Sequence, residues 1–92
     1  MPIGVYFDVK GMTAETYAAI HDQLVAEGVG EPDGRVFHAG FSVGDDIQVF
    51  DIWESHQQFE AFGRKLMPIL AEHRIDPGTP RIGTIERVIR YD

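Results

Sequence analysis

Histidines are the side chains of this chain best suited to proton transfer near neutral pH, because the imidazole ring changes its charge there. Of the four, His21 and His73 fall on the apolar stripes of two predicted helices, and His38 lies within a predicted strand. We treat these three as candidate catalytic bases that face a pocket. A histidine on such a stripe is more often a neutral core residue held by one hydrogen bond. The fourth, His56, forms with Glu60 an i, i+4 pair typical of a solvated helix face.

The residues needed for several other chemistries are missing. Without cysteine the chain has no thiolate nucleophile, disulfide or cysteine-bound metal. Its histidines and carboxylates show no H-x(3)-H, H-E-x-x-H or calcium-loop spacing, and no G-x-S-x-G elbow offers an activated serine. We therefore expect neither a metal nor any other cofactor.

The charge balance restricts the partners. Fifteen acidic residues outnumber eight basic ones, which gives a formal net charge of −7. Binding to phosphate backbones and to anionic membrane surfaces relies on Lys and Arg, so we expect no nucleic acid and no membrane partner. No apolar run is long enough to cross a bilayer, and Met1–Lys10 lacks the basic and apolar blocks of a secretory signal. The expected location is the cytoplasm.

The hydrophobic pattern predicts four strands and two helices in a single domain, residues 1–92. The strands are predicted at Ile3–Val9, Arg35–Val43, Ile47–Glu54 and Arg81–Tyr91. Thr13 caps the first helix, which ends at the glycine-rich loop Glu27–Gly34. Ser55 opens the second helix, with Gln58 completing an S-x-x-Q capping box, and Pro68 should kink or divide it.

The order β-α-β-β-α-β predicts an α+β fold of the ferredoxin-like type. Two right-handed crossovers that share one four-stranded antiparallel sheet place the first and third strands in its centre and both helices on one face. The short segment Gly44–Asp46 should join the second and third strands as a hairpin.

Alternation along the strands assigns side chains to the two faces of this sheet. The more apolar set should lie beneath the helices; it consists of Val5, Phe7, Val9, Phe37, Ala39, Phe41, Val43, Phe50 and Ile52. The other set should face away from the helices, and it includes Tyr6, Asp8, Val36, His38, Ser42, Val49, Asp51, Trp53 and Val88. The apolar members of this second set are large for an exposed surface. We therefore expect a homodimer that packs two open sheet faces together as a barrel.

The junction between the third strand and the second helix carries a resemblance to a known superfamily. Trp53, Ser55, Phe59 and Phe62 form a W-x-S-x(3)-F-x-x-F pattern. Together with the element order, this pattern resembles the dimeric α+β-barrel superfamily, in particular its antibiotic-biosynthesis-monooxygenase-like branch. The resemblance covers nearly the whole chain and implies a dimeric α+β barrel. Members of the superfamily include cofactor-free oxygenases of polycyclic phenols and haem-degrading enzymes.

The chain departs from the haem-degrading members of that superfamily. Those enzymes use an asparagine in the first strand, with a tryptophan and a histidine ten residues apart on the second helix. This chain contains no asparagine, has Phe62 at the tryptophan position and places His73 eleven residues beyond it. These departures argue against haem degradation. The cofactor-free oxygenases depend on asparagine, tryptophan and tyrosine, and Trp53 matches one of these.

Two functions stay open from the sequence. The first is a cofactor-independent monooxygenase that deprotonates a small aromatic or phenolic compound in a pocket between sheet and helices. The second is a non-catalytic dimer that binds a small ligand or has a regulatory role. Besides the three histidines, the candidate substrate-binding residues are Trp53, Phe62, Tyr17 and Asp8.

Overall fold

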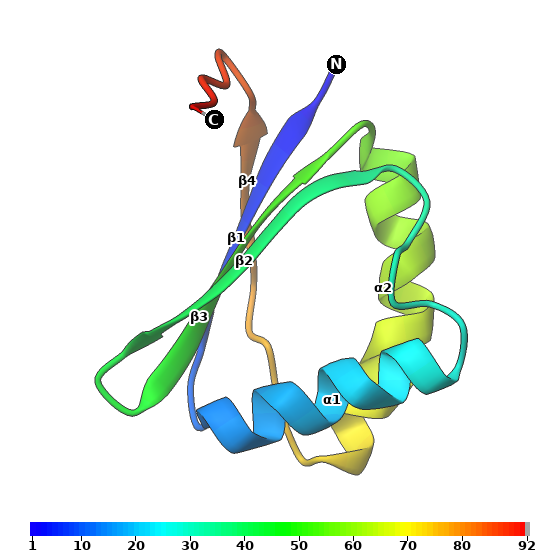
Figure 1. Ribbon diagram of the computed structural model, residues 1–92, viewed down its shortest axis with the longest axis vertical. Coiled ribbons are helices and arrows are strands. Elements are labelled where there is room, and N and C mark those ends of the chain that lie inside the picture. The colour runs from blue at the N-terminus through cyan, green and yellow to red at the C-terminus, as the bar shows by residue number, and fades with distance from the viewer. Residues whose placement is uncertain (92) are drawn as a thin grey trace.

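A computed structural model describes residues 1–91 of the chain (Figure 1). Within them the elements follow in the order β1 (Ile3–Val9), α1 (Ala14–Ala26), β2 (Arg35–Val43), β3 (Asp46–Trp53), α2 (His56–Glu72) and β4 (Arg81–Thr84). The strands form one antiparallel sheet in the order β2-β3-β1-β4, and both helices lie on the same face of it. The predicted ferredoxin-like α+β fold, with the first and third strands in the centre, is confirmed.

Both helices begin where the sequence predicts. The Thr13 hydroxyl accepts a hydrogen bond from the Thr16 N–H at 3.1 Å, and the Ser55 hydroxyl accepts one from the Gln58 N–H at 3.2 Å. Each bond satisfies a backbone donor that the first helical turn leaves without a partner. Pro68 lies inside α2 and does not divide it. Of the helices in the described part of the chain, neither is long and apolar enough to span a membrane.

The last strand is shorter than predicted. β4 pairs with β1 only over Arg81–Thr84, whereas the sequence pattern predicts a strand that reaches Tyr91. One further backbone bond follows Thr84, in which the Ile85 N–H donates to the Pro2 carbonyl oxygen at 3.0 Å, and the Ile85 side chain packs over Gly4. The alternating residues after Ile85 form no strand in the described part of the chain.

The faces of β2 and β3 are the reverse of the prediction. On β1, Val5, Phe7 and Val9 lie beneath the helices as expected. Opposed residues in an antiparallel pair point to the same side of the sheet. Val5 pairs with Asp51, and Asp51 pairs with His38. The less apolar set of β2 and β3 therefore lies on the covered face together with Val5. The covered residues therefore include His38, Val49, Asp51 and Trp53. The residues that face away are Phe37, Ala39, Phe41, Val43, Phe50 and Ile52.

A β-bulge at Val36 brings Arg35 to the covered face as well. The register shifts between Arg35 and Phe37, so that two steps along β2 match one step along β3. Val36 is the extra residue, and it changes the alternation of the strand. Arg35 and His38, which regular alternation would put on opposite faces, consequently both face the helices. The expectation that the more apolar side chains lie beneath the helices also fails, because the open face of this sheet is itself apolar.

The core lies between the helices and the covered face. Trp53 is completely buried, and its ring packs against Phe59 and Phe62 of α2 at centroid distances of 5.8 and 5.4 Å. The remaining buried apolar residues of this cluster are Val5, Val9, Met12, Ile20, Leu24, Ile47, Ile69 and Leu70. Burial of each large apolar side chain stabilises the fold by about 1.5–3 kcal/mol, so this layer is the main source of stability.

The open face carries a patch of large apolar side chains, which we call the open-face patch: Phe37, Phe41, Val43 and Phe50. The first three are 44%, 45% and 50% exposed. The Phe37 and Phe50 rings lie 6.1 Å apart, which makes the patch continuous across β2 and β3. Contiguous apolar surface of this kind is typical of an interface.

Candidate active site

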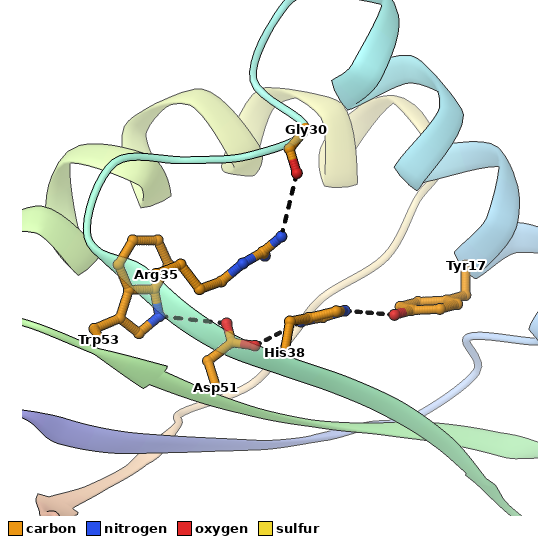
Figure 2. A network of polar contacts seen from close by, with 6 residues as sticks. All are labelled: Tyr17, Gly30, Arg35, His38, Asp51 and Trp53. Atoms are coloured by element: carbon orange, nitrogen blue, oxygen red, sulfur yellow. Dashed lines mark hydrogen bonds and ion pairs between the residues drawn. The ribbon is translucent and has the colours of Figure 1, made fainter. Parts of the chain in front are cut away.

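A line of four polar side chains runs beneath the helices (Figure 2). The Tyr17 hydroxyl is hydrogen-bonded to His38 Nε2 at 2.5 Å, and His38 Nδ1 lies 2.5 Å from Asp51 Oδ1. The Trp53 indole N–H donates to the other carboxylate oxygen, Asp51 Oδ2, at 3.3 Å. The four residues come from α1, β2 and β3, and only the fold brings them together.

Asp51 anchors this line. Its side chain is 6% exposed, and each of its two oxygens accepts a hydrogen bond. A buried carboxylate without donors would be strongly unfavourable. Within residues 1–91, every buried side-chain polar atom has a hydrogen-bond partner. Asp51 therefore acts as a double acceptor that holds His38 and Trp53 in place.

The hydrogen bonds assign the proton on the His38 ring. Because the Asp51 carboxylate can only accept, Nδ1 carries the hydrogen, and the neutral ring presents a lone pair at Nε2. The Tyr17 hydroxyl donates to that lone pair. A carboxylate that orients an imidazole, which in turn contacts a hydroxyl, is the arrangement of a proton relay.

Tyr17 holds its proton more tightly than a free tyrosine. Burial is the main cause that raises its pKa above the ordinary value of 10.0; the negative charge of Asp51 raises the pKa further, and the positive charge of Arg35 opposes the shift. Loss of the proton would place a second negative charge near a buried carboxylate. The phenol is therefore neutral at neutral pH and serves as a hydrogen-bond donor to His38.

Gly40 leaves the space that the Tyr17 ring occupies. A Cβ atom at position 40 would lie 2.5 Å from both Cζ and Oη of Tyr17, far inside van der Waals contact. The Tyr17 and His38 rings lie nearly parallel, with an interplanar angle of 16° and centroids 6.0 Å apart. The missing side chain at Gly40 thus permits the contact between α1 and β2.

The polar line borders a cavity of about 290 Å³ between the sheet and the helices. Most of the lining is apolar and comes from both layers, with Phe7 and Val49 on the sheet and Ile20, Phe62 and Leu66 on the helices. Five polar side chains reach the cavity: Tyr17, His21, Arg35, His38 and Asp51. An apolar hollow with a few convergent polar groups is the usual form of a small-molecule site.

The structure brings together four of the residues proposed from the sequence. His38, Tyr17 and Phe62 line the cavity, and His21 lies in its lining as an exposed residue of α1. Trp53 does not line the cavity, because it is completely buried behind Phe62 and supports Asp51 instead.

Two other candidates lie away from the cavity. His73 ends α2, where its Nε2 contacts the Gln23 side-chain oxygen at 3.1 Å and links the two helices. Asp8 lies on the open face and forms an ion pair with Lys10 at 3.1 Å. Neither residue is among those that line the cavity.

Asp51 and Arg35 line the cavity and are not among the site residues predicted from the sequence. The predicted alternation places Asp51 on the open face, and regular alternation along β2 would separate Arg35 from His38. One signal was available: Asp51 and Trp53 stand two apart on one strand, so a buried tryptophan implies a buried aspartate that needs partners. No group of three or more potential metal ligands gathers among residues 1–91.

Solved structures share this fold. A protein from Chloroflexus aurantiacus J-10-fl, provisionally assigned as an antibiotic biosynthesis monooxygenase, matches with a TM-score of 0.68 at 14% identity, over 98% of each chain. SnoaB, a cofactor-independent oxygenase from Streptomyces nogalater, matches with a TM-score of 0.63 at 14% identity, over 98% of this chain and 96% of SnoaB. A provisionally assigned monooxygenase from Shewanella loihica PV-4 matches with a TM-score of 0.60 at 18% identity, over 95% of this chain and 96% of that one.

These identities are low, so the likeness establishes the fold alone. No known family pattern and no curated protein sequence matches the chain. The resemblance to the antibiotic-biosynthesis-monooxygenase-like branch, predicted from the element order and the W-x-S-x(3)-F-x-x-F junction, is confirmed at the level of fold.

The raised pKa of Tyr17 makes stability depend on alkaline pH. The folded chain holds the Tyr17 proton more tightly than the unfolded chain does. The resulting contribution to the free energy of unfolding is complete below the unfolded pKa near 10.0, and it is lost as pH rises through the higher folded pKa. We expect Tyr17→Phe to flatten this decline in the free energy of unfolding, and Asp51→Asn to lower the Tyr17 pKa. Urea unfolding across alkaline pH, with phenolate absorbance in parallel, measures both. The control Tyr91→Phe alters a 90% exposed residue and should keep the wild-type decline. A stability profile of Tyr17→Phe that matches the wild type would contradict the view that Tyr17 causes the decline.

A side chain at position 40 should break the contact between Tyr17 and His38. We expect Gly40→Ala to lower the free energy of unfolding by about 1–3 kcal/mol, because its Cβ overlaps the Tyr17 ring. Gly63→Ala is the matched control, since its Cβ meets no atom and alanine favours the helix. Urea unfolding gives the stabilities, and imidazole NMR signals report whether His38 has lost its partner. Equal stability of the two variants, with unchanged His38 signals, would contradict the proposed packing.

Proposed function

We propose that this protein is a cofactor-independent monooxygenase that oxidises a small, electron-rich phenol or anthrone in its cavity. The observation that carries the proposal is the Tyr17–His38–Asp51 relay, which opens onto an apolar cavity. The fold shared with SnoaB, a cofactor-independent oxygenase, supports the same reaction class.

The relay supplies the proton transfer that starts such a reaction. Tyr17 passes its hydroxyl proton to His38 Nε2 while its oxygen takes the acidic proton of the substrate. The result is an imidazolium that Asp51 stabilises at 2.5 Å and a substrate anion in the cavity. Because the pKa of Tyr17 is raised, a lone tyrosinate would be a costly base, and the transfer depends on His38 as the final acceptor.

The substrate anion then reacts with molecular oxygen. It transfers one electron to O₂, and the resulting substrate radical and superoxide combine into a peroxide anion, which takes the proton back from His38. Loss of water from the hydroperoxide leaves a carbonyl group. In total, a methylene group and O₂ become a carbonyl group and one water molecule, so no external reductant is needed. The apolar lining supports this sequence because it excludes water from the reactive anion.

Oxygen consumption tests the reaction. On a panel of anthrones and quinols we expect His38→Gln to lower the rate of oxygen uptake by about 10²–10⁴-fold, the usual contribution of a positioned base. Tyr17→Phe and Asp51→Asn should also lower it. His73→Gln is the matched control, since His73 lies outside the cavity. Circular dichroism confirms folding of each variant. Wild-type protein that binds these compounds and consumes no oxygen would instead be the non-catalytic binding dimer.

We also propose that two copies associate through the open-face patch. The residues that motivate this interface are Phe37, Phe41, Val43 and Phe50, in place of the predicted Val49 and Trp53, which lie beneath the helices. An isologous contact would bury the patch twice and close a barrel with the helices outside.

The oligomeric state tests this interface. We expect the wild type to be a dimer in analytical ultracentrifugation at micromolar concentration and Phe41→Lys to be a monomer, because each dimer would bury two unpaired charges. Val25→Lys, at a 56% exposed position of α1 outside the patch, should stay dimeric. A stable, folded wild-type monomer would rule out the barrel.

A further inference from the structure

We infer that Arg35 binds a carboxylate on the substrate, so that the ligand of the cavity is an aromatic acid. This inference deepens the proposed function and rests on it in one respect only, that the aromatic substrate occupies the cavity. Arg35 lines the cavity on the same strand as His38, because the bulge at Val36 turns both side chains to the covered face. Figure 2 shows Arg35, His38 and Tyr17 on the same side of the sheet.

The Arg35 guanidinium has little else to bind. Its carbon Cζ lies 5.4 Å from the centre of the Phe62 ring, and one nitrogen donates to the Gly30 carbonyl oxygen at a long 3.4 Å. A guanidinium has five N–H donors, so most of them have no protein acceptor here. Within residues 1–91, close contacts between basic and acidic side chains join Lys10 to Asp8, His38 to Asp51 and His56 to Glu60, and none includes Arg35.

Arg35 differs from the other Lys and Arg residues of the described chain because it is partly buried rather than exposed, and it has no counter-charge. Acidic residues outnumber basic ones almost two to one, fifteen to eight, yet the partly buried Arg35 contacts none of them among the described residues. Asp51, the carboxylate that shares the cavity, already accepts from His38 and Trp53. A cation in an apolar hollow is costly unless an anion joins it. A ligand carboxylate would supply that anion.

The shape of the site favours an aromatic acid over other anions. Phe62 lies beside the guanidinium and, with Phe7 and Val49, offers apolar walls to a ring system. A planar guanidinium binds a carboxylate through two parallel hydrogen bonds, which also fixes the direction of the ring. Arg35 and His38 are three residues apart along β2, a span of about 10 Å at most. One or two fused rings bridge that span and place the acidic hydrogen at Tyr17 while the carboxylate rests on Arg35.

A pair of probes that differ only in charge tests this inference. Isothermal titration calorimetry compares a hydroxynaphthoate with the matching hydroxynaphthamide, which has nearly the same shape and no charge. We expect wild-type protein to bind the acid at least about tenfold more tightly, as is usual for a charge-assisted contact. Arg35→Gln should bind the two probes equally. Arg35→Lys should keep part of the preference, because lysine retains the charge and loses the planar fork.

Two controls distinguish binding at Arg35 from an effect of the overall charge of the protein and from the proposed oxygenation. Arg64→Gln removes the same charge from an exposed position of α2 outside the cavity and should keep the full preference. Tyr17→Phe should keep it as well while oxygen uptake falls. Equal wild-type affinities, a preference that survives in Arg35→Gln, or no binding of either probe would overturn the inference. A preserved preference without any oxygen uptake would overturn the proposed oxygenase and leave the acid site standing.

Discussion

The buried carboxylate of Asp51 constrains the covered side of this protein more than any other group. A carboxylate in that position needs donors, and the fold supplies two, His38 from the neighbouring strand and Trp53 from the next covered position of its own strand. Those two contacts determine which face of β3 points toward the helices. They also turn the imidazole so that its free nitrogen meets Tyr17. Asp51 therefore links the core at Trp53, the pairing of β2 with β3 and the contact between His38 and Tyr17.

The two faces of the sheet divide the apolar residues in an unusual way. The covered face carries His38, Asp51 and Arg35 around a hollow of about 290 Å³, and the helices do not fill it. The open face instead carries large apolar side chains that no part of residues 1–91 fully covers. In most domains the more apolar face is the one beneath the helices. Here the covered face borders an apolar cavity with a few polar groups, a form typical of small-molecule sites, and the open face has the composition of an interface.

Local signals in the sequence predicted the elements well and the site poorly, for a physical reason. Helix starts at Thr13 and Ser55 depend on neighbouring residues only, and a capping hydroxyl is visible in the sequence. The face that a strand buries depends instead on its partners. The register of β3 against β1 and β2 puts Asp51 and His38 beneath the helices, and one extra residue at Val36 brings Arg35 to the same face. Nothing in the local sequence marks that register or the bulge. His38, a candidate from the sequence, lines the cavity, whereas the positions of Asp51 and Arg35 beside it follow only from the register.

The polar groups of the cavity are poorly explained by stability. Replacing both partners of a buried hydrogen bond by apolar residues of the same size is often nearly neutral or stabilising, so a small domain gains little by keeping Asp51 and His38 in its interior. An unfilled hollow and a cation without a counter-charge reduce stability further. Folded domains retain only about 5–15 kcal/mol in total, so such costs are a large share of the margin. In the complex that we propose, a single ligand would offset all three costs, because it would fill the hollow, neutralise Arg35 and give its proton to His38 through Tyr17.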